Sequence, residues 1–362
     1  MKKIITILFI AFSIILTAYS CKGENGAEPK ETLVDPSSMT WTVDTVFYPL
    51  YESFQTLMQS IYVIDSNNIW LCGHCDDVRG GFWRYTASGW APYEIFNDIS
   101  LSSALPRKIV GANNNLYIVG NKNDGALLLK WSNDKWNEIN TNLNTSMLNG
   151  TITGSGSVTA CGYNGVMLNY DGYTVTYDTI VIKKKYNNYT YSMPSIAQYN
   201  NDIYVLASYL PGDVTDPEWS YYLLKGSFNN WKFVDSFKIN SSSTIDSYKF
   251  GTYVLYSSSW GKLYSCGPMG LWQWNNNSWE SLISNSYALY GIYGVRDDYI
   301  LSVGVYGKIY FYNGNSWKEL TNLIPNQSSI FFRDIWTDGK TIYLVGNING
   351  TTTLIIKGKK KT

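Results

Sequence analysis

The residues best suited to chemistry are the two cysteines of Cys72-Gly73-His74-Cys75. Two cysteines at this spacing carry out thiol–disulfide exchange when the first lies at a helix N-terminus, where the helix dipole lowers its pKa. Here the apolar pattern of a strand ends at Cys72, and two aspartates follow Cys75. Cys161 and Cys266 share the register of Cys72 in an internal repeat, where a small buried side chain serves packing. We therefore expect packing thiols or a local disulfide, and a thiol oxidoreductase is the least favoured function.

Other catalytic arrangements lack the side chains that they need. His74 is the only histidine, so a zinc site or a serine or cysteine triad has a single imidazole available. No glycine-rich phosphate loop precedes a helical pattern. Carboxylates that are distant in sequence can still meet at the axis of a closed ring. The sequence thus predicts no catalytic residue, no metal and no cofactor, and it leaves an extracellular polysaccharide-acting enzyme as the alternative.

The composition indicates short strands and tight turns. The 362 residues include 31 Tyr, 14 Trp and 30 Gly, and aromatic side chains reach 16%. Aromatic residues favour strands, and glycine favours the turns between them. Lys and Arg together number 28, as do Asp and Glu, so the formal net charge is zero. Because no overall positive field exists to attract a polyanion, a nucleic-acid partner is not expected.

The N-terminus predicts export. A basic start, Met1-Lys2-Lys3, precedes the apolar run 4–16, which is shorter than the roughly 20 residues of a membrane span. We assign residues 1–20 to a signal peptide. The segment 16–21 resembles the lipobox of bacterial lipoproteins, which implies that Cys21 is acylated and becomes the mature N-terminus. An ordinary cleaved signal peptide with a free Cys21 is the alternative.

Lipidation of Cys21 would place the protein on a bacterial membrane. Acyl chains gain about 0.8 kcal/mol per buried methylene group, so two chains anchor a protein firmly. The expected location is the outer membrane, on either its periplasmic or its cell-surface side. Residues 21–38 then form the lipidated cysteine and a flexible tether, rich in Gly, Pro and Glu.

An internal repeat organises the rest of the chain. One pattern occurs seven times in the sequence. It consists of an apolar segment, a polar turn, a strand ending in a small residue and Gly, a strand ending in an aromatic residue, another polar turn and usually a Trp. The small residue and Gly recur as Cys72-Gly73, Val119-Gly120, Cys161-Gly162, Cys266-Gly267, Val303-Gly304 and Val345-Gly346, with Ala207-Ser208 in the fourth copy. The outer Trp recurs as Trp90, Trp136, Trp231, Trp279 and Trp317, with Val175 or Tyr177 in the third copy.

The repeat predicts an all-β fold, a single β-propeller. A unit of about 45 residues with four short strands matches one propeller blade. The seventh copy stops after three strands, and Met39–Val43 supplies the missing outer strand, so the N-terminal strand closes the C-terminal blade. We predict seven four-stranded blades over residues 39–358, followed by a basic tail at 359–362. Six or eight blades, or an open solenoid, remain the structural alternatives.

The turn before the outer Trp carries a resemblance to known families. Tyr312-Asn313-Gly314-Asn315-Ser316-Trp317 resembles the Asp-box of sialidase-like and photosystem-assembly-factor-like propellers, and it is similar to kelch-type repeats. Such motifs fix strand ends and blade packing. The resemblance therefore implies a fold and no particular chemistry. Sialidase activity is not expected, because the five arginines do not reproduce the arginine signature of that family.

The long loops predict where a partner binds. The connections between strands two and three of a blade, and those between blades, lie on one face of a propeller and hold the long segments of this chain. Loops on a rigid scaffold usually carry the binding residues. We expect a monomeric, non-catalytic binding or scaffolding protein that contacts an envelope or extracellular protein or a glycan there. The candidate contact residues are Arg79, Lys184, Tyr186, Tyr189, Tyr191, Asp213, Asp216 and Trp219.

Simpler interpretations of these loops stay open. The Lys and Tyr side chains at 183–191 suit stacking on sugars or contact with an acidic protein surface, but the same composition also fits a solvated surface loop. The acidic residues at 213–218 match no established calcium loop, so a solvated acidic turn is preferred there.

Overall fold

A computed structural model describes residues 32–49, 53–101, 103–112, 115–123, 125–154, 156–182, 191–209 and 218–361. The signal peptide, Cys21 and most of the expected tether lie outside these residues. Val34–Thr362 forms one compact unit. Val34 already belongs to it, because its N–H donates to the Gly339 carbonyl at 2.8 Å and its own carbonyl accepts from the Tyr299 hydroxyl at 2.8 Å.

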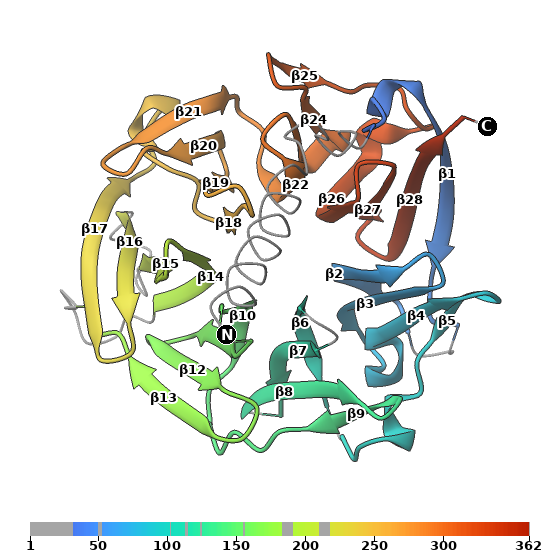
Figure 1. Ribbon diagram of the computed structural model, residues 1–362, viewed down its shortest axis with the longest axis horizontal. Coiled ribbons are helices and arrows are strands. Elements are labelled where there is room, and N and C mark those ends of the chain that lie inside the picture. The colour runs from blue at the N-terminus through green and yellow to red at the C-terminus, as the bar shows by residue number, and fades with distance from the viewer. Residues whose placement is uncertain are drawn as a thin grey trace, which may run out of the picture. The chain divides into compact units, whose positions relative to one another are not determined.

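The described part of this unit is a ring of seven four-stranded antiparallel sheets, which confirms the seven-bladed β-propeller (Figure 1). Blade 1 contains β2 (Thr56–Asp65), β3 (Asn68–Cys75), β4 (Phe82–Thr86) and β5 (Gly89–Pro92); blade 2 contains β6 (Leu105–Ala112), β7 (Asn115–Lys122), β8 (Gly125–Ser132) and β9 (Lys135–Glu138). Blade 3 contains β10 (Met147–Ile152), β11 (Val158–Gly162), β12 (Val166–Tyr170) and β13 (Val175–Thr179); blade 4 contains β14 (Tyr191–Tyr199), β15 (Asp202–Tyr209), β16 (Trp219–Ser227) and β17 (Asn230–Ile239).

The remaining blades follow the same order from the inner to the outer strand. Blade 5 contains β18 (Val254–Ser257), β19 (Leu263–Gly267), β20 (Gly270–Trp274) and β21 (Trp279–Ser284); blade 6 contains β22 (Leu289–Arg296), β23 (Tyr299–Gly304), β24 (Ile309–Tyr312) and β25 (Trp317–Glu319). Blade 7 contains β26 (Ile330–Thr337), β27 (Thr341–Ile348), β28 (Thr352–Lys360) and β1 (Met39–Val46). The helical elements among the described residues are short 3-10 turns: η1 (Pro36–Ser38), η2 (Val78–Gly81), η3 (Ile95–Asn97), η4 (Ile245–Ser247), η5 (Val305–Gly307) and η6 (Gln327–Ser329).

The two ends of the sequence close the ring as predicted. β1 pairs with β28 in antiparallel register from Met39↔Lys360 to Val46↔Thr353, and Figure 1 shows the blue and red strands side by side at the seam. Lys359 and Lys360, which the sequence assigned to a tail, belong to this ladder. Pairing β1 at the seam covers the strand edge that an open array would expose.

The repeated glycine has a geometric cause. In six blades the inner strand carries a β-bulge, and the bulge lies opposite the small residue and its Gly or Ser neighbour on the second strand. A Cβ atom added to Gly73 would lie 2.3 Å from the Leu57 carbonyl oxygen, and one added to Gly162 would lie 2.2 Å from the Ser146 oxygen. No real Cβ tolerates such contacts, so glycine lets the irregular inner strand approach its neighbour.

The repeated Trp seals the outer side of most blades. It lies opposite the aromatic residue that ends the third strand, because the short turn between these strands fixes the register. Ring centroids are 5.1 Å apart for Tyr85 and Trp90, 5.4 Å for Trp131 and Trp136, and 5.3 Å for Tyr312 and Trp317. Such cross-strand aromatic pairs stabilise a sheet beyond the area that they bury. No helix in the described ranges has the length and apolar character to cross a membrane.

Candidate functional site

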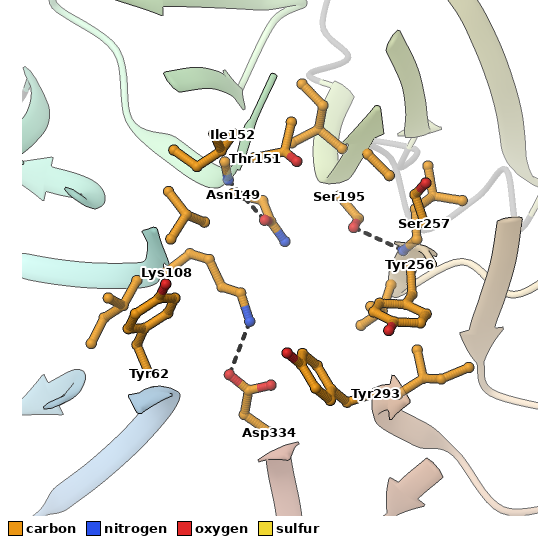
Figure 2. Close-up of a pocket in the computed structure, with 18 of the residues that line it drawn as sticks. Tyr62, Lys108, Asn149, Thr151, Ile152, Ser195, Tyr256, Ser257, Tyr293 and Asp334 are labelled. Carbon is orange, nitrogen blue, oxygen red and sulfur yellow. Dashed lines mark hydrogen bonds and ion pairs between the residues drawn. The ribbon is translucent and has the colours of Figure 1, made fainter. Parts of the chain in front are cut away.

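A central cavity of about 1040 Å³ runs along the ring axis, and residues of all seven inner strands line it. Figure 2 shows that the side chains of Tyr62, Lys108, Tyr293 and Asp334 reach into it from four different blades. Such a volume is at the upper end of the range that is usual for ligand pockets, about 300–1000 Å³. The cavity is therefore large enough to admit a ligand.

The bulges decide which side chains meet at one end of the cavity. The bulge inserts one extra residue into the inner strand, and a bulge re-aims the side chain that it carries. These residues lie near the beginning of the inner strands, on the face where the long connections between blades arrive. We call the five that line the cavity the mouth: Gln59, Arg107, Leu148, Tyr290 and Arg333.

In four of the six bulged blades, the residue that follows the bulge links its blade to a neighbour. In three blades a polar side chain at this place accepts the backbone N–H of the next inner strand, and in a fourth it donates to a backbone carbonyl. The contacts are Asp334 Oδ2 with Ile61 N at 3.1 Å, Ser60 Oγ with Ile109 N at 3.2 Å, Ser195 Oγ with Leu255 N at 2.9 Å, and Asn149 Nδ2 with the Pro194 oxygen at 3.0 Å. These residues position the cavity wall.

Asp334 is committed to this scaffold. Its Oδ2 atom accepts from the Ser60 hydroxyl at 3.0 Å, the Ile61 N–H at 3.1 Å and the Lys108 ammonium at 2.9 Å. Its Oδ1 atom accepts from the N–H of Ile335 at 3.0 Å. Both carboxylate oxygens are thus occupied by donors of the protein itself.

Arg333 lies in an aromatic cluster at the mouth. Its guanidinium carbon is 4.2 Å from the ring centroid of Phe331 and 5.2 Å from that of Tyr290, and Tyr290 stacks on Tyr253 at 4.7 Å. Its Nε donates a long hydrogen bond of 3.4 Å to Asn347 Oδ1. Burial lowers the pKa of Arg333, and the neighbouring tyrosines oppose that change. Within the described ranges, no carboxylate pairs with this guanidinium.

Arg107 is the second guanidinium at the mouth. Its Nε atom is buried and has no hydrogen-bond partner among the residues that the structure describes. Burial lowers the pKa of this side chain too, and Tyr163 acts in the opposite direction. Two arginines therefore face the cavity without the carboxylates that normally accompany a half-buried guanidinium.

The polysaccharide-enzyme alternative required carboxylates that meet at the axis. Among the described residues that line the cavity, Asp334 is the one carboxylate. Glycoside hydrolysis uses two carboxyl groups that flank the scissile bond. The described wall supplies one, and that one is held by four donors, so it lacks the pair that this chemistry needs.

The four cysteines that the structure describes, Cys72, Cys75, Cys161 and Cys266, are free thiols in strands. Cys72 is fully buried, and burial raises its pKa; Cys161 and Cys266 are buried and shifted in the same direction. Cys75 is also a free cysteine, and its Sγ lies 3.3 Å from the Ser53 hydroxyl. A raised pKa suppresses the thiolate that exchange chemistry requires. The packing interpretation of the repeat therefore holds for Cys72.

The predicted contact residues fall in three different settings. Lys184, Tyr186, Tyr189, Asp213 and Asp216 lie outside the described residues. Tyr191 lies in the core between blades, 4% exposed, and its hydroxyl donates to the Ile180 carbonyl. Trp219, at the start of β16, is 45% exposed, and the Arg79 guanidinium is paired with Asp77.

Sequence reasoning missed the residues of the mouth. Loop composition directed attention to long segments, whereas Arg107, Tyr290 and Arg333 lie inside strands. The signal was nevertheless present, since each residue of the mouth is the unpaired bulge residue opposite a small-residue and Gly marker on the next strand. In the described part of the chain, no group of three His, Cys, Asp or Glu side chains could hold a metal ion.

Fold and site together define a seven-bladed β-propeller with a cationic, aromatic entrance to its central cavity. Comparison with solved structures places YCF48 bound to a D1 peptide among the similar ones, with a TM-score of 0.59 and 13% identity over 91% of this chain and 96% of that chain. The others include the extracellular domain of BT4673 from B. thetaiotaomicron (TM-score 0.56, 14% identity, 86% of this chain and 39% of that one) and the WD40 propeller domain of Doa1 (0.54, 10%, 86% and 99%).

These likenesses concern the fold alone. They agree with the resemblance of the repeats to photosystem-assembly-factor-like propellers. No model of a known protein family matches the sequence, and no curated protein sequence matches it either.

Proposed function

We propose that this protein is a non-catalytic binding propeller of the bacterial envelope, anchored through lipid on Cys21, which holds a protein segment at the mouth of its central cavity. The observation that carries the proposal is the cavity itself. It opens among bulged residues that a closed structural core does not need, and those residues include two guanidinium groups and the half-buried ring of Tyr290. Aromatic and arginine side chains are the residues that most often dominate protein recognition.

A peptide is the favoured ligand class. The seven inner strands surround the cavity, and a space enclosed in this way suits an extended chain better than a folded protein surface. YCF48, one of the structures with a similar fold, is bound to a D1 peptide. Because that likeness is one of fold, we take from it that a propeller of this architecture can accept a peptide, and nothing about sequence.

The binding proposal is tested by selecting ligands from a random displayed peptide library with the full chain in nonionic detergent. Leu148→Trp fills the mouth from blade 3, and Thr176→Trp places the same ring on the exposed outer strand β13 of that blade. We expect selected peptides to bind the wild type and the Thr176→Trp variant and not to bind the Leu148→Trp variant. Selection of no peptide, or equal binding by both variants with both folded, would count against a peptide site in the channel.

The anchoring proposal needs a separate experiment. Cells that express the full chain are fed an alkyne-labelled fatty acid, and the protein is examined for label and for membrane association. We expect both properties in the wild type and neither in Cys21→Ala. Fatty-acid label on the Cys21→Ala variant, or a wild-type protein that does not associate with membranes, would contradict lipidation at this residue.

A further inference from the structure

The lining of the cavity carries more positive charge than the protein as a whole. The described lining residues include three cations, Arg107, Lys108 and Arg333, and one carboxylate, Asp334, which gives a formal charge of +2. The whole chain has 28 basic and 28 acidic residues and is neutral. A cavity with low-dielectric walls concentrates such a field, so the excess acts on whatever enters it.

Asp334 cannot relieve this excess at the mouth. Its oxygens already accept from Ser60, Ile61, Lys108 and Ile335, as described above. Lys108 is therefore neutralised, while the two arginines are not. Removing a cation from water without an anion beside it is costly, and structures retain such groups where a ligand supplies the anion.

The surroundings of Arg333 define what can bind it. Phe331 and Tyr290 lie against the guanidinium, and within the described residues its one hydrogen bond runs from the Nε atom to Asn347. The terminal N–H groups form a planar fork that matches the two oxygens of a carboxylate. An amide of the same shape offers one acceptor and cannot neutralise the charge.

Arg107 provides a second such group from blade 2. It is a bulged residue like Arg333, so both side chains enter the mouth at the same level of the ring, one blade to either side of Gln59. Its buried Nε has no partner within the described residues. Two separated guanidinium groups favour a ligand with more than one carboxylate.

From these contacts we propose that the mouth is a subsite for acidic side chains of a bound peptide, with Arg107 and Arg333 each binding a carboxylate. The proposal rests on the peptide-binding function proposed above and names the chemistry of that ligand. A carboxylate can come from Asp and Glu side chains or from the C-terminus of a chain, and the favoured source is the side chain because two cations must be served.

The test uses three peptide probes, each labelled with an uncharged fluorophore, on the full chain in nonionic detergent. They are (Glu-Ser-Ala)3 with an amidated end, (Gln-Ser-Ala)3 with an amidated end, and (Gln-Ser-Ala)3 with a free C-terminal carboxylate. Fluorescence anisotropy gives the affinity of each. We expect the Glu probe to bind at least about tenfold more tightly than either Gln probe, and increasing salt to weaken its binding most, since salt screens the attraction between its carboxylates and the two arginines.

Variants locate the subsite. Arg107→Gln and Arg333→Gln should each weaken the Glu probe about tenfold and leave the Gln probes unchanged, while Arg333→Lys should retain part of the affinity. Arg296→Gln is the matched control, because that arginine is paired with Asp298 outside the cavity lining. Thermal unfolding of each variant shows that the fold is intact, and the salt titration of the wild type needs no variant at all.

The outcomes separate this inference from the binding function. Equal affinity for the Glu and amidated Gln probes, or the same loss in Arg296→Gln, overturns the acidic subsite. A free-carboxylate Gln probe that binds as tightly as the Glu probe reassigns the site to a chain terminus and overturns the side-chain version. The library can also select peptides that are not enriched in Asp and Glu and that bind the Arg107→Gln and Arg333→Gln variants as well as the wild type. In that case the binding function stands and only this inference fails.

Discussion

The Nζ atom of Lys108 lies 2.9 Å from the Oδ2 atom of Asp334, although their strands are not neighbours in the ring. Lys108 belongs to blade 2 and Asp334 to blade 7, and blade 1 lies between them. Ser60 of blade 1 donates to the same oxygen at 3.0 Å. One carboxylate therefore joins three inner strands, close to the seam where the ring closes.

Asp334→Asn should lower the free energy of unfolding by about 1–3 kcal/mol. An amide has one oxygen, so its NH₂ group must face either the three donors at Oδ2 or the N–H of Ile335. Urea unfolding followed by tryptophan fluorescence measures the change. Lys108→Met is the comparison: it leaves three donors in place and removes a partly exposed partner, so we expect a loss below about 1 kcal/mol. An equal or larger loss in Lys108→Met would show that the ion pair dominates.

Gly162→Ala should destabilise the protein by about 1–3 kcal/mol, the usual cost of forcing extra atoms into a packed site. Its Cβ would lie 2.2 Å from the Ser146 oxygen, and a backbone atom cannot turn aside as a side chain can. Gly154 is in the same blade, and its Cβ would meet nothing closer than 3.8 Å. Equal stability of Gly162→Ala and Gly154→Ala in thermal unfolding would contradict the packing role of the marker.

Lys357 gives stability a dependence on alkaline pH. Burial and repulsion from Lys359 lower the pKa of Lys357 from 10.5 to about 8, and its ammonium lies over the rings of Tyr343 and Tyr85. Because the unfolded chain keeps the Lys357 proton between these two values, this side chain contributes a rise in stability as the pH increases from about 8 to 10.5. The buried thiols of Cys72, Cys161 and Cys266, whose pKa is raised from 9.0, contribute a fall above about pH 9, so the Lys357 contribution is the difference between the wild type and a variant without it.

Lys357→Met should abolish that rise and stabilise the protein at pH 7 by at most about 1 kcal/mol, a figure reduced for the partial exposure of the side chain. Urea midpoints measured across this pH range provide the check. Lys360→Met, an exposed lysine of the same strand, should keep the rise. If wild type and Lys357→Met show the same slope, another group titrates.

Cys72 should react slowly with thiol reagents in the folded protein. It is fully buried and its pKa is raised by that burial, so modification requires local opening. In a Cys21→Ser background we expect its modification to be at least about 100-fold slower than that of a free cysteine, and to become complete in urea. Mass spectrometry of the labelled peptides assigns the site. Rapid labelling of Cys72, or a disulfide with Cys75 that cycles under mild reductant, would restore the oxidoreductase hypothesis.

The fold was predictable because the residues that define each blade lie close together in the sequence. Most blades carry their own turn residues, glycine and aromatic pair, and the unmatched strand at Met39–Val43 identified the closure. Seven copies of the same strand and turn pattern favour one architecture, a ring of seven blades. The fourth copy fits this pattern although it has Ala207-Ser208 in place of the small residue and Gly.

The candidate site was less predictable because it depends on contacts between blades. The sequence around Arg333 does not predict its contact with Tyr290. Tyr290 lies in the preceding blade, and its ring contacts the Arg333 guanidinium. The glycine markers were visible, but their meaning as partners of bulges required the register of the strands. Tyr191 shows the converse case, because it was assigned to a loop by composition and instead begins the inner strand β14, where its ring is buried.

Closure through β1 also sets the order of folding. The Thr42 hydroxyl meets the Lys357 carbonyl across a sequence separation of 315 residues. Contacts between such distant residues form late and slow the folding of a chain. During synthesis β1 must therefore wait, unpaired, until β28 is available, and β28 presents an open edge until β1 pairs with it. Unpaired strand edges pair readily with other chains. The folding chain must therefore be protected from aggregation until β1 and β28 have paired, although the closed ring no longer exposes either edge.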